Sequence, residues 1–110
     1  MAQTFDLCLL NNNLYYFSPE DRTPLLQRLA GHLKDGGRLA VQVPVLRQAR
    51  NDPVLLVFHA YLLGHNHLSG LPYPDDVAES LAAAGLTHIT RTPLWFGAQW
   101  MYFVARKRLP

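Results

Sequence analysis

The chain has a single cysteine, Cys8, so it cannot contain an internal disulfide framework. Because Cys8 lies within an apolar run, we interpret it as a small buried hydrophobic residue rather than as a nucleophile. The apolar runs fall short of the roughly 20 residues that a membrane-spanning helix requires. The first residues also lack the basic start and apolar core of a signal peptide. These absences predict a cytoplasmic protein that has no membrane partner.

Neither positive nor negative charge predominates strongly, since the net charge is only +2 over 110 residues. The basic residues gather only at the tail, in Arg106, Lys107 and Arg108, without the interleaved aromatic residues of a nucleic-acid surface. We interpret this cluster as a solvated chain end and predict no nucleic-acid partner. Internal repeats and low-complexity segments are missing too. Hydrophobic residues nevertheless make up 49% of the sequence, which indicates one globular domain with a core of its own.

The first apolar run, residues 5–10 (FDLCLL), shows no clean alternation of polar and apolar positions. This pattern is typical of a strand that is covered on both faces, as in a parallel sheet. Three asparagines, Asn11, Asn12 and Asn13, follow it directly. Asparagine tolerates turn conformations, and its amide offers donors and acceptors at the carboxyl end of a strand.

A helix is predicted after this strand. Ser18 can cap it and Pro19 suits its first position, but Pro24 would lie inside it. We therefore expect an opening turn at residues 19–22 and the main helix from Pro24 onward. Its predicted buried stripe consists of Leu25, Leu26, Leu29, Ala30 and Leu33. Gly36 is the expected helix stop, and residues 38–45 form a second strand.

The second half of the chain contains two further helices and two strands. Asp52-Pro53 opens a helix that is apolar nearly all round, so a sheet, a lid or a partner chain must cover it. A shorter helix spans residues 75–84, where Tyr73 makes a weak cap. Residues 86–92 and 99–106 are the last strands, and the connection between them is too short for a crossover helix. We therefore expect them to form an antiparallel pair.

This order of elements resembles the C-terminal half of class I S-adenosylmethionine-dependent methyltransferases. The resemblance rests on residues 4–44, on LPYPDDVAESLAAAGL and on GAQWMYFVARK, and it covers nearly the whole chain. It implies an α/β fold that is half of a Rossmann-like methyltransferase sheet, with strands equivalent to 4-5-7-6. It further implies that the last pair is antiparallel and that helices lie on both faces of the sheet.

Two features of that family are missing, namely the glycine-rich loop after its first strand and the acidic residue that ends its second. Gly36-Gly37 follows a helix and precedes a strand, whereas a loop that cradles a cofactor needs the reverse order. We therefore predict that residues 1–110 form a single partial domain that lacks the N-terminal cofactor-binding half. The resemblance implies S-adenosylmethionine as cofactor only together with that half, and the isolated chain is expected to be inactive.

The resemblance also implies site residues at the end of the first strand. It places Leu10, Asn11 and Asn12 beside the methionine portion of the cofactor, where backbone groups would hold its amino group. An alternative is that the asparagines only terminate the strand.

Transfer to an oxygen or nitrogen acceptor can also need a base, and His65 and His67 are the candidate catalytic residues. His59 is a third histidine in this region, and all three are also open to a surface or packing interpretation. Two histidines without a nearby Cys or second acidic ligand indicate zinc only weakly, so no metal is predicted. An apolar, aromatic cover favours a small organic acceptor. Its members are Phe58, Tyr61, Leu62, Trp95 and Trp100.

The first strand would be central in a whole sheet of this family, but here its outer edge is bare. A strand of this length leaves about three ladder hydrogen bonds unmade, each worth about 1 kcal/mol. Exposed hydrophobic edges recruit other chains. We therefore predict that the chain forms a dimer or other homo-oligomer, or that it pairs with a separate N-terminal half. The alternative function is a non-catalytic, self-associating interaction module derived from the same fold.

Overall fold

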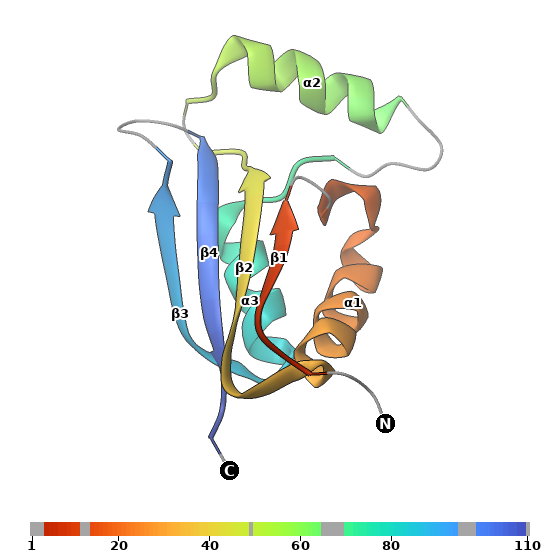
Figure 1. Cartoon of the computed structure of the whole chain (residues 1–110). Coiled ribbons are helices and arrows are strands. Elements are labelled where there is room, and N and C mark those ends of the chain that lie inside the picture. The colour runs from red at the N-terminus through yellow and green to blue at the C-terminus, as the bar shows by residue number, and fades with distance from the viewer. Residues whose placement is uncertain (1–3, 12–13, 49, 65–69, 95–98, 110) are drawn as a thin grey trace.

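A mixed four-stranded sheet organises the computed structural model, which describes residues 4–11, 14–48, 50–64, 70–94 and 99–109. Its strand order is β1-β2-β4-β3. β1 is parallel to β2, whereas β4 is antiparallel to both of its neighbours (Figure 1). The strands are β1 (Phe5–Asn11), β2 (Leu33–Pro44), β3 (Leu86–Pro93) and β4 (Trp100–Lys107). This topology confirms the α/β fold, the 4-5-7-6 order and the antiparallel last pair.

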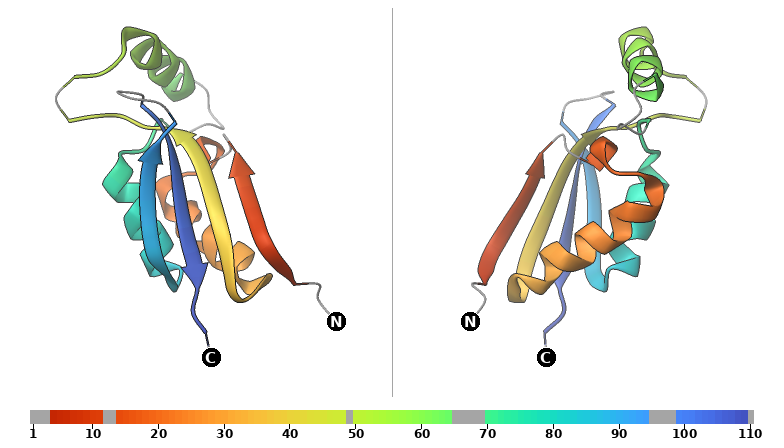
Figure 2. Two further views of the ribbon diagram at one scale, coloured as in Figure 1. Left: turned by 60° about the vertical axis from the view of Figure 1, so that its left-hand side comes forward. Right: turned by 90° about the vertical axis from the view of Figure 1, so that its right-hand side faces the viewer.

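In the described ranges, three α-helices accompany the sheet, namely α1 (Pro19–Gly31), α2 (Pro53–Leu63) and α3 (Pro74–Ala83), and a short 3-10 turn, η1 (Leu14–Tyr16), precedes α1. α1 and α3 lie against the same face of the sheet, and α2 lies across the end where β1 and β2 finish (Figures 1 and 2). The distribution of helices differs from the expectation of helices on both faces. α2 lies at the sheet's end instead, where polar contacts fix its start, and the second face carries no helix among the described residues.

The core fills the space between the sheet and the pair α1 and α3. Alternate residues of β2 point into it, and Leu39, Val41 and Val43 are fully buried there, as the twofold periodicity of a strand requires. β4 adds Phe103 and Ala105 from the adjacent positions. The helices contribute Leu26 from α1 and Val77 and Leu81 from α3. One face of the sheet therefore carries the hydrophobic core of the described structure.

The end of α1 differs from the prediction. The helix runs through the exposed Pro24, which removes a single backbone donor, and it ends at Gly31 with His32 as its C-cap. The predicted stop at Gly36 is therefore wrong. Gly36 has a φ of +79° and belongs to β2, and a Cβ on Gly37 would lie 2.8 Å from the carbonyl oxygen of Lys34. The glycine pair thus allows a close backbone approach at the start of β2.

Two other boundaries also differ, because β2 begins at Leu33, five residues before the predicted start, and α1 is continuous from Pro19 instead of beginning its main part at Pro24. The remaining boundaries agree with the sequence to within about one residue. Ser18 is the N-cap of α1, although its hydroxyl donates to Asp21 Oδ2 at 2.9 Å instead of accepting from the backbone. Asp52 caps α2, since its Oδ1 accepts from the N–H of Val54 at 2.8 Å. Tyr73 makes no side-chain cap on α3, which confirms the weak start of that helix.

β1 lies at the edge of the sheet, so one side of it has no strand partner among the described residues. Cys8 and Leu10 are half-buried toward the helices. Leu7 and Leu9 point the other way and are 50% and 58% exposed. The bare, apolar edge predicted from the sequence is therefore confirmed. No helix among the residues described is long and apolar enough to span a membrane.

Candidate functional site

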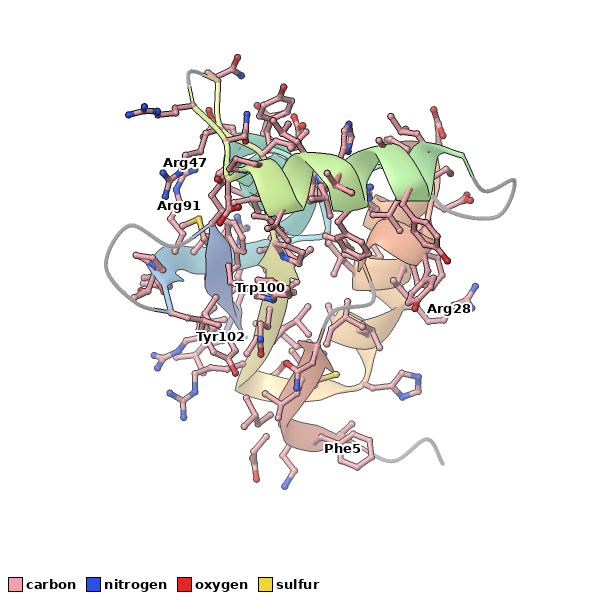
Figure 3. The ribbon with its side chains drawn as sticks, turned by 90° about the horizontal axis from the view of Figure 1, so that it is seen from above. Phe5, Arg28, Arg47, Arg91, Trp100 and Tyr102 are labelled. Atoms are coloured by element: carbon pink, nitrogen blue, oxygen red, sulfur yellow. The ribbon has the colours of Figure 1, made fainter. Side chains whose placement is uncertain are left out.

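The carboxyl ends of β1 and β2 meet at the edge of the sheet that α2 crosses, as the view from above shows (Figure 3). Leu10 is half-buried opposite Val41, and Asn11 is exposed opposite Gln42. In α/β sheets, ligands bind outside the carboxyl ends of the strands. Two of the three predicted cofactor contacts, Leu10 and Asn11, thus lie at this edge, and Asn12 falls outside the described residues. Their contact with a cofactor stays a prediction.

Gln99 fixes the start of α2 to the sheet. Its side chain is buried, with 6% exposed, and its Nε2 donates to the carbonyl of Val45 at 2.9 Å and to Asn51 Oδ1 at 2.8 Å. Its Oε1 accepts from the N–H of Asp52, the N-cap of α2. Asn51 in turn closes the loop through two hydrogen bonds with the backbone of Arg47. One amide therefore joins the end of β2, the loop and the first turn of α2.

His59 holds α2 farther along the helix. Its Nδ1 accepts from the backbone N–H of Leu71 at 3.0 Å. Because a backbone N–H can only donate, Nδ1 carries no proton in this arrangement, and a neutral His59 has its proton on Nε2. Gly70 packs so closely that a Cβ on it would overlap Cε1 of His59. The half-buried His59 is thus engaged in a structural contact through one of its ring nitrogens.

Arg22 ties α1 to the segment that follows α2. It is 6% exposed, and its Nε and Nη2 donate to the carbonyls of Phe17 and Gly70, each at 3.2 Å. Burial lowers the pKa of the Arg22 guanidinium, and the negative charges of Asp76 and Glu20 oppose that shift. The backbone of residues 70–71 is therefore held by side chains from α1 and α2.

The candidate catalytic residues His65 and His67 lie outside the described residues. Within the described ranges, no group of three or more His, Cys, Asp or Glu residues could hold a metal ion. Of the residues predicted to form an aromatic cover, Leu62 is buried, and Phe58 and Trp100 are half-buried. Tyr61, by contrast, is 58% exposed. The fifth member, Trp95, is outside the described part of the chain.

A cleft of about 510 Å³ lies between the first turn of α3 and the end of β3. Its lining includes Arg47, Asp76 and Glu79, together with an ion pair in which Arg91 Nη1 lies 2.7 Å from Asp75 Oδ1. Arg47 and Arg91 lie near each other in the view from above (Figure 3). Both partners of the ion pair are well exposed, so the cleft is a polar surface feature with charges of both signs.

The sequence reasoning did not identify Arg22, Gln99 or Gly70 as structural contacts of this edge. Arg22 had a usable pattern, because it shares a helix face with Leu26 and Ala30 at a spacing of four residues. Gln99 had none, since its partners lie 47 and more positions earlier in the chain.

The parallel pair, the antiparallel pair and their order are those of part of a class I methyltransferase sheet, as the resemblance predicted. No protein-family model matches the chain, and no curated protein matches it.

Solved structures share the fold. Human N-acetylserotonin methyltransferase, solved with SAM, superposes with a TM-score of 0.78 at 23% identity, over 94% of this chain and 29% of that one. The mitomycin 7-O-methyltransferase MmcR gives a TM-score of 0.83 at 20% identity, over 97% and 31%. An O-methyltransferase family protein from Burkholderia thailandensis gives 0.77 at 22% identity, over 97% and 31%. The chain thus spans about a third of the length of these proteins.

Proposed function

We propose that the chain is the C-terminal half of an S-adenosylmethionine-dependent methyltransferase that acts on a small organic acceptor. The proposal depends above all on the strand order β1-β2-β4-β3, with α2 across the carboxyl ends of the parallel pair. The superposed methyltransferases support it, since each matches this chain nearly in full. Residues 1–110 then form one partial domain. The cofactor binds only when an N-terminal half adds the glycine-rich loop that this sequence lacks.

The chain's own residues contribute one rim of the site. Leu10, Asn11 and Asn12 would contact the methionine portion of the cofactor, and the position of Leu10 and Asn11 at the end of β1 supports this role. The cofactor supplies a methyl group on an activated sulfonium. Orientation of the reactants and exclusion of water then provide much of the rate enhancement. The rim residues and α2 therefore act by positioning the cofactor and the acceptor. His65 and His67 are the proposed bases for an oxygen or nitrogen acceptor.

Calorimetric titration with S-adenosylhomocysteine tests this function. The isolated chain is expected to give no binding heat at millimolar ligand. A complex with the product of an adjacent or upstream reading frame that encodes a strand, a glycine-rich loop and a helix is expected to bind. Binding by the isolated chain would contradict the need for a second half. Absence of binding by the complex would contradict the methyltransferase function.

A second candidate is a non-catalytic module that self-associates through β1, and the exposure of Leu7 and Leu9 favours it. Light scattering at micromolar concentration is expected to give the mass of a dimer. A Leu9→Lys variant is expected to be monomeric, whereas Val57→Lys, a matched change on the exposed surface of α2, is expected to keep the dimer. A monodisperse wild-type monomer, or dissociation by Val57→Lys alone, would exclude association through β1.

A further inference from the structure

A hollow of about 300 Å³ joins residues of β2, β3 and β4 on the face of the sheet turned away from α1 and α3 (Figure 2). Its lining includes three basic side chains, those of Arg38, His88 and Arg106. Arg38 precedes Gln42, the β2 partner of Asn11, by four residues, which is about 13 Å along a strand. The hollow is therefore separate from the carboxyl edge of the sheet, where the candidate cofactor rim lies.

Two arginines lie next to each other in this hollow. Arg38 on β2 is directly opposite Arg106 on β4, and like charges in such a cross-strand pair destabilise a sheet. Both side chains are exposed, and neither forms an ion pair with any residue that the structure describes. The sequence pattern alone indicates a solvated chain end at Arg106, whereas in the structure this residue belongs to β4. A bound anion would replace the repulsion between the two guanidinium groups by a shared attraction.

His88 lies at an irregularity in the pairing of β3 with β4. The register shifts between Thr87 and Thr90, so His88 and Ile89 are opposite a single residue of β4, which defines a β-bulge. His88 has a φ of 53°, and it is the only non-glycine residue with a positive φ in the described ranges. Glycine is the usual residue at such a left-handed position, because a side chain there is strained. A strained histidine at the wall of a basic hollow indicates a role for its ring.

The hydroxyl of Thr87 fixes the proton on the His88 ring. Thr87 Oγ1 donates its only proton to the carbonyl of Arg106 at 3.2 Å, so it accepts from Nδ1 of His88, which lies 3.1 Å away. Nδ1 therefore carries a proton, and Nε2 is the ring nitrogen left for a ligand. In the charged form of the ring, Nε2 is a donor as well. The hydroxyl of Thr90, which also lines the hollow, adds a further donor.

We propose that this hollow binds the phosphate group of a small phosphate monoester. The guanidinium groups of Arg38 and Arg106 hold the phosphate oxygens, since each planar fork can donate two parallel hydrogen bonds. His88 and Thr90 donate to the oxygens that remain. A hollow of about 300 Å³ is at the lower end of the range for small-molecule sites and is larger than a phosphate ion. The organic part of the ligand then contacts the half-buried Val104.

The charge of the hollow favours a monoester over a diester. A monoester carries about two negative charges at neutral pH, which match the two guanidinium groups, whereas a diester carries one. The diester linkage of nucleic acids and phospholipids therefore fits less well. The proposal makes no use of cofactor binding or methyl transfer, so it can succeed or fail separately from the proposed function.

Nuclear magnetic resonance titration of the ¹⁵N-labelled full chain tests the proposal. The signals to follow are the backbone amide of His88 and the Nε–H groups of Arg38 and Arg106. Phenyl phosphate is expected to shift these signals to saturation. It should bind at least about threefold more tightly than inorganic phosphate, because the ring covers apolar surface. It should bind at least about tenfold more tightly than methyl phenyl phosphate, a diester that forms fewer charge-assisted hydrogen bonds.

Two arginine variants measure the role of the paired charges. The double variant R38Q with R106Q is expected to bind phenyl phosphate at least about tenfold more weakly. The matched control is R28Q with R50Q, which removes the same charge at two exposed arginines that do not line the hollow. Its affinity should stay within about twofold of the wild type, because distant exposed charges are screened by salt.

His88→Gly separates a binding role of the ring from a structural one. Glycine relieves the strain at a φ of 53°, so the variant is expected to unfold at a higher urea concentration than the wild type. The same variant should bind phenyl phosphate about tenfold more weakly, because a donor is lost. A weaker site in a more stable protein cannot result from unfolding.

Several results would overturn the proposal. One is no shift of the three signals with phenyl phosphate, and another is an equal loss of affinity in the control variant. Equal binding of the diester would contradict recognition of a dianion. Equal binding of inorganic phosphate would contradict an organic ligand. Unchanged affinity in His88→Gly would remove the imidazole from the site.

Discussion

The backbone N–H of Leu71 donates to Nδ1 of His59 over 3.0 Å, and this bond joins the middle of α2 to the segment that leads into α3. Gln99 performs the same task at the first turn of the helix. α2 packs against the core through Leu55 and Leu62, but much of its remaining surface is exposed, so these two polar contacts add to packing in holding the helix in place.

Replacing Gly70 by alanine is expected to destabilise the protein by about 1–3 kcal/mol, because the new Cβ would overlap Cε1 of His59. Urea denaturation followed by circular dichroism measures the loss. Gly31→Ala is a matched control, since a Cβ there meets nothing within 4 Å. That control is expected to be neutral or stabilising by about 0.4–1 kcal/mol.

The same steric cause can be checked by rescue. In the Gly70→Ala background, His59→Ala is expected to lower the free energy of unfolding much less than it does in the wild type. The reason is that the alanine at position 70 already displaces the imidazole from its contact, so removing the ring also removes the clash. Strict additivity of the two changes would contradict a contact between residues 59 and 70.

Gln99→Ala is expected to lower the free energy of unfolding by about 1–3 kcal/mol, since the buried carbonyl of Val45 and the N–H of Asp52 lose their partner. A double-mutant cycle with Asn51→Ala should give a coupling energy of about 0.5–3 kcal/mol, because the two amides are bonded directly. Gln27→Ala, on the exposed side of α1, should change stability by less than about 0.5 kcal/mol. Equal effects at Gln27 and Gln99 would refute the anchoring role.

Arg22 and Arg91 should respond very differently to replacement by methionine. Arg22 is buried and satisfies two carbonyls, so its loss is expected to cost about 1–3 kcal/mol. The ion pair of Arg91 with Asp75 has side chains that are 45% and 78% exposed, and its loss should cost less than about 1 kcal/mol. Denaturation of the two variants in parallel measures both values, and the reverse ranking would contradict the burial argument.

Cys8 is expected to react more slowly with iodoacetamide in the native protein than in urea. Burial raises the pKa of the Cys8 thiol, so at neutral pH less of it is thiolate than in the unfolded chain. The same shift makes the folded protein less stable at high pH, because the thiol of the unfolded chain ionises first as the pH rises through its ordinary range near 9.0. The contribution of Cys8 to the free energy of unfolding is therefore fully present below that pH range and is lost above it. Cys8→Ala should remove this part of the decrease in stability at alkaline pH. Equal alkylation rates in the two states would contradict the burial effect.

The sequence was sufficient to predict the order of elements and the edge position of β1. Both depend on local patterns, namely apolar runs, caps and a connection too short for a crossover. The end of α1 was mispredicted because Gly36-Gly37 has the composition of a helix stop. In the structure, the register of β1 against β2 decides otherwise, since Phe5 pairs with Leu33 and the strand begins before the glycines.

The candidate site was predictable only where it depends on topology. Leu10 and Asn11 fall at the carboxyl edge because parallel strands end together, and any sequence with this order would place them there. The anchors Gln99, Arg22 and Gly70 depend on contacts between residues far apart in the chain. Such contacts leave no periodic trace in the sequence, with the exception of the helical spacing of Arg22.

β4 lies between β2 and β3, although it is the last of the four strands in the chain. Both neighbours of β4 in the sheet therefore precede it in the chain. Until residues 100–107 arrive, only the β1–β2 pair can form, and the inner edge of β2 stays open to wrong partners. Removing this one strand would remove two of the three strand pairings, so the sheet is exposed to aggregation until β4 has docked between β2 and β3.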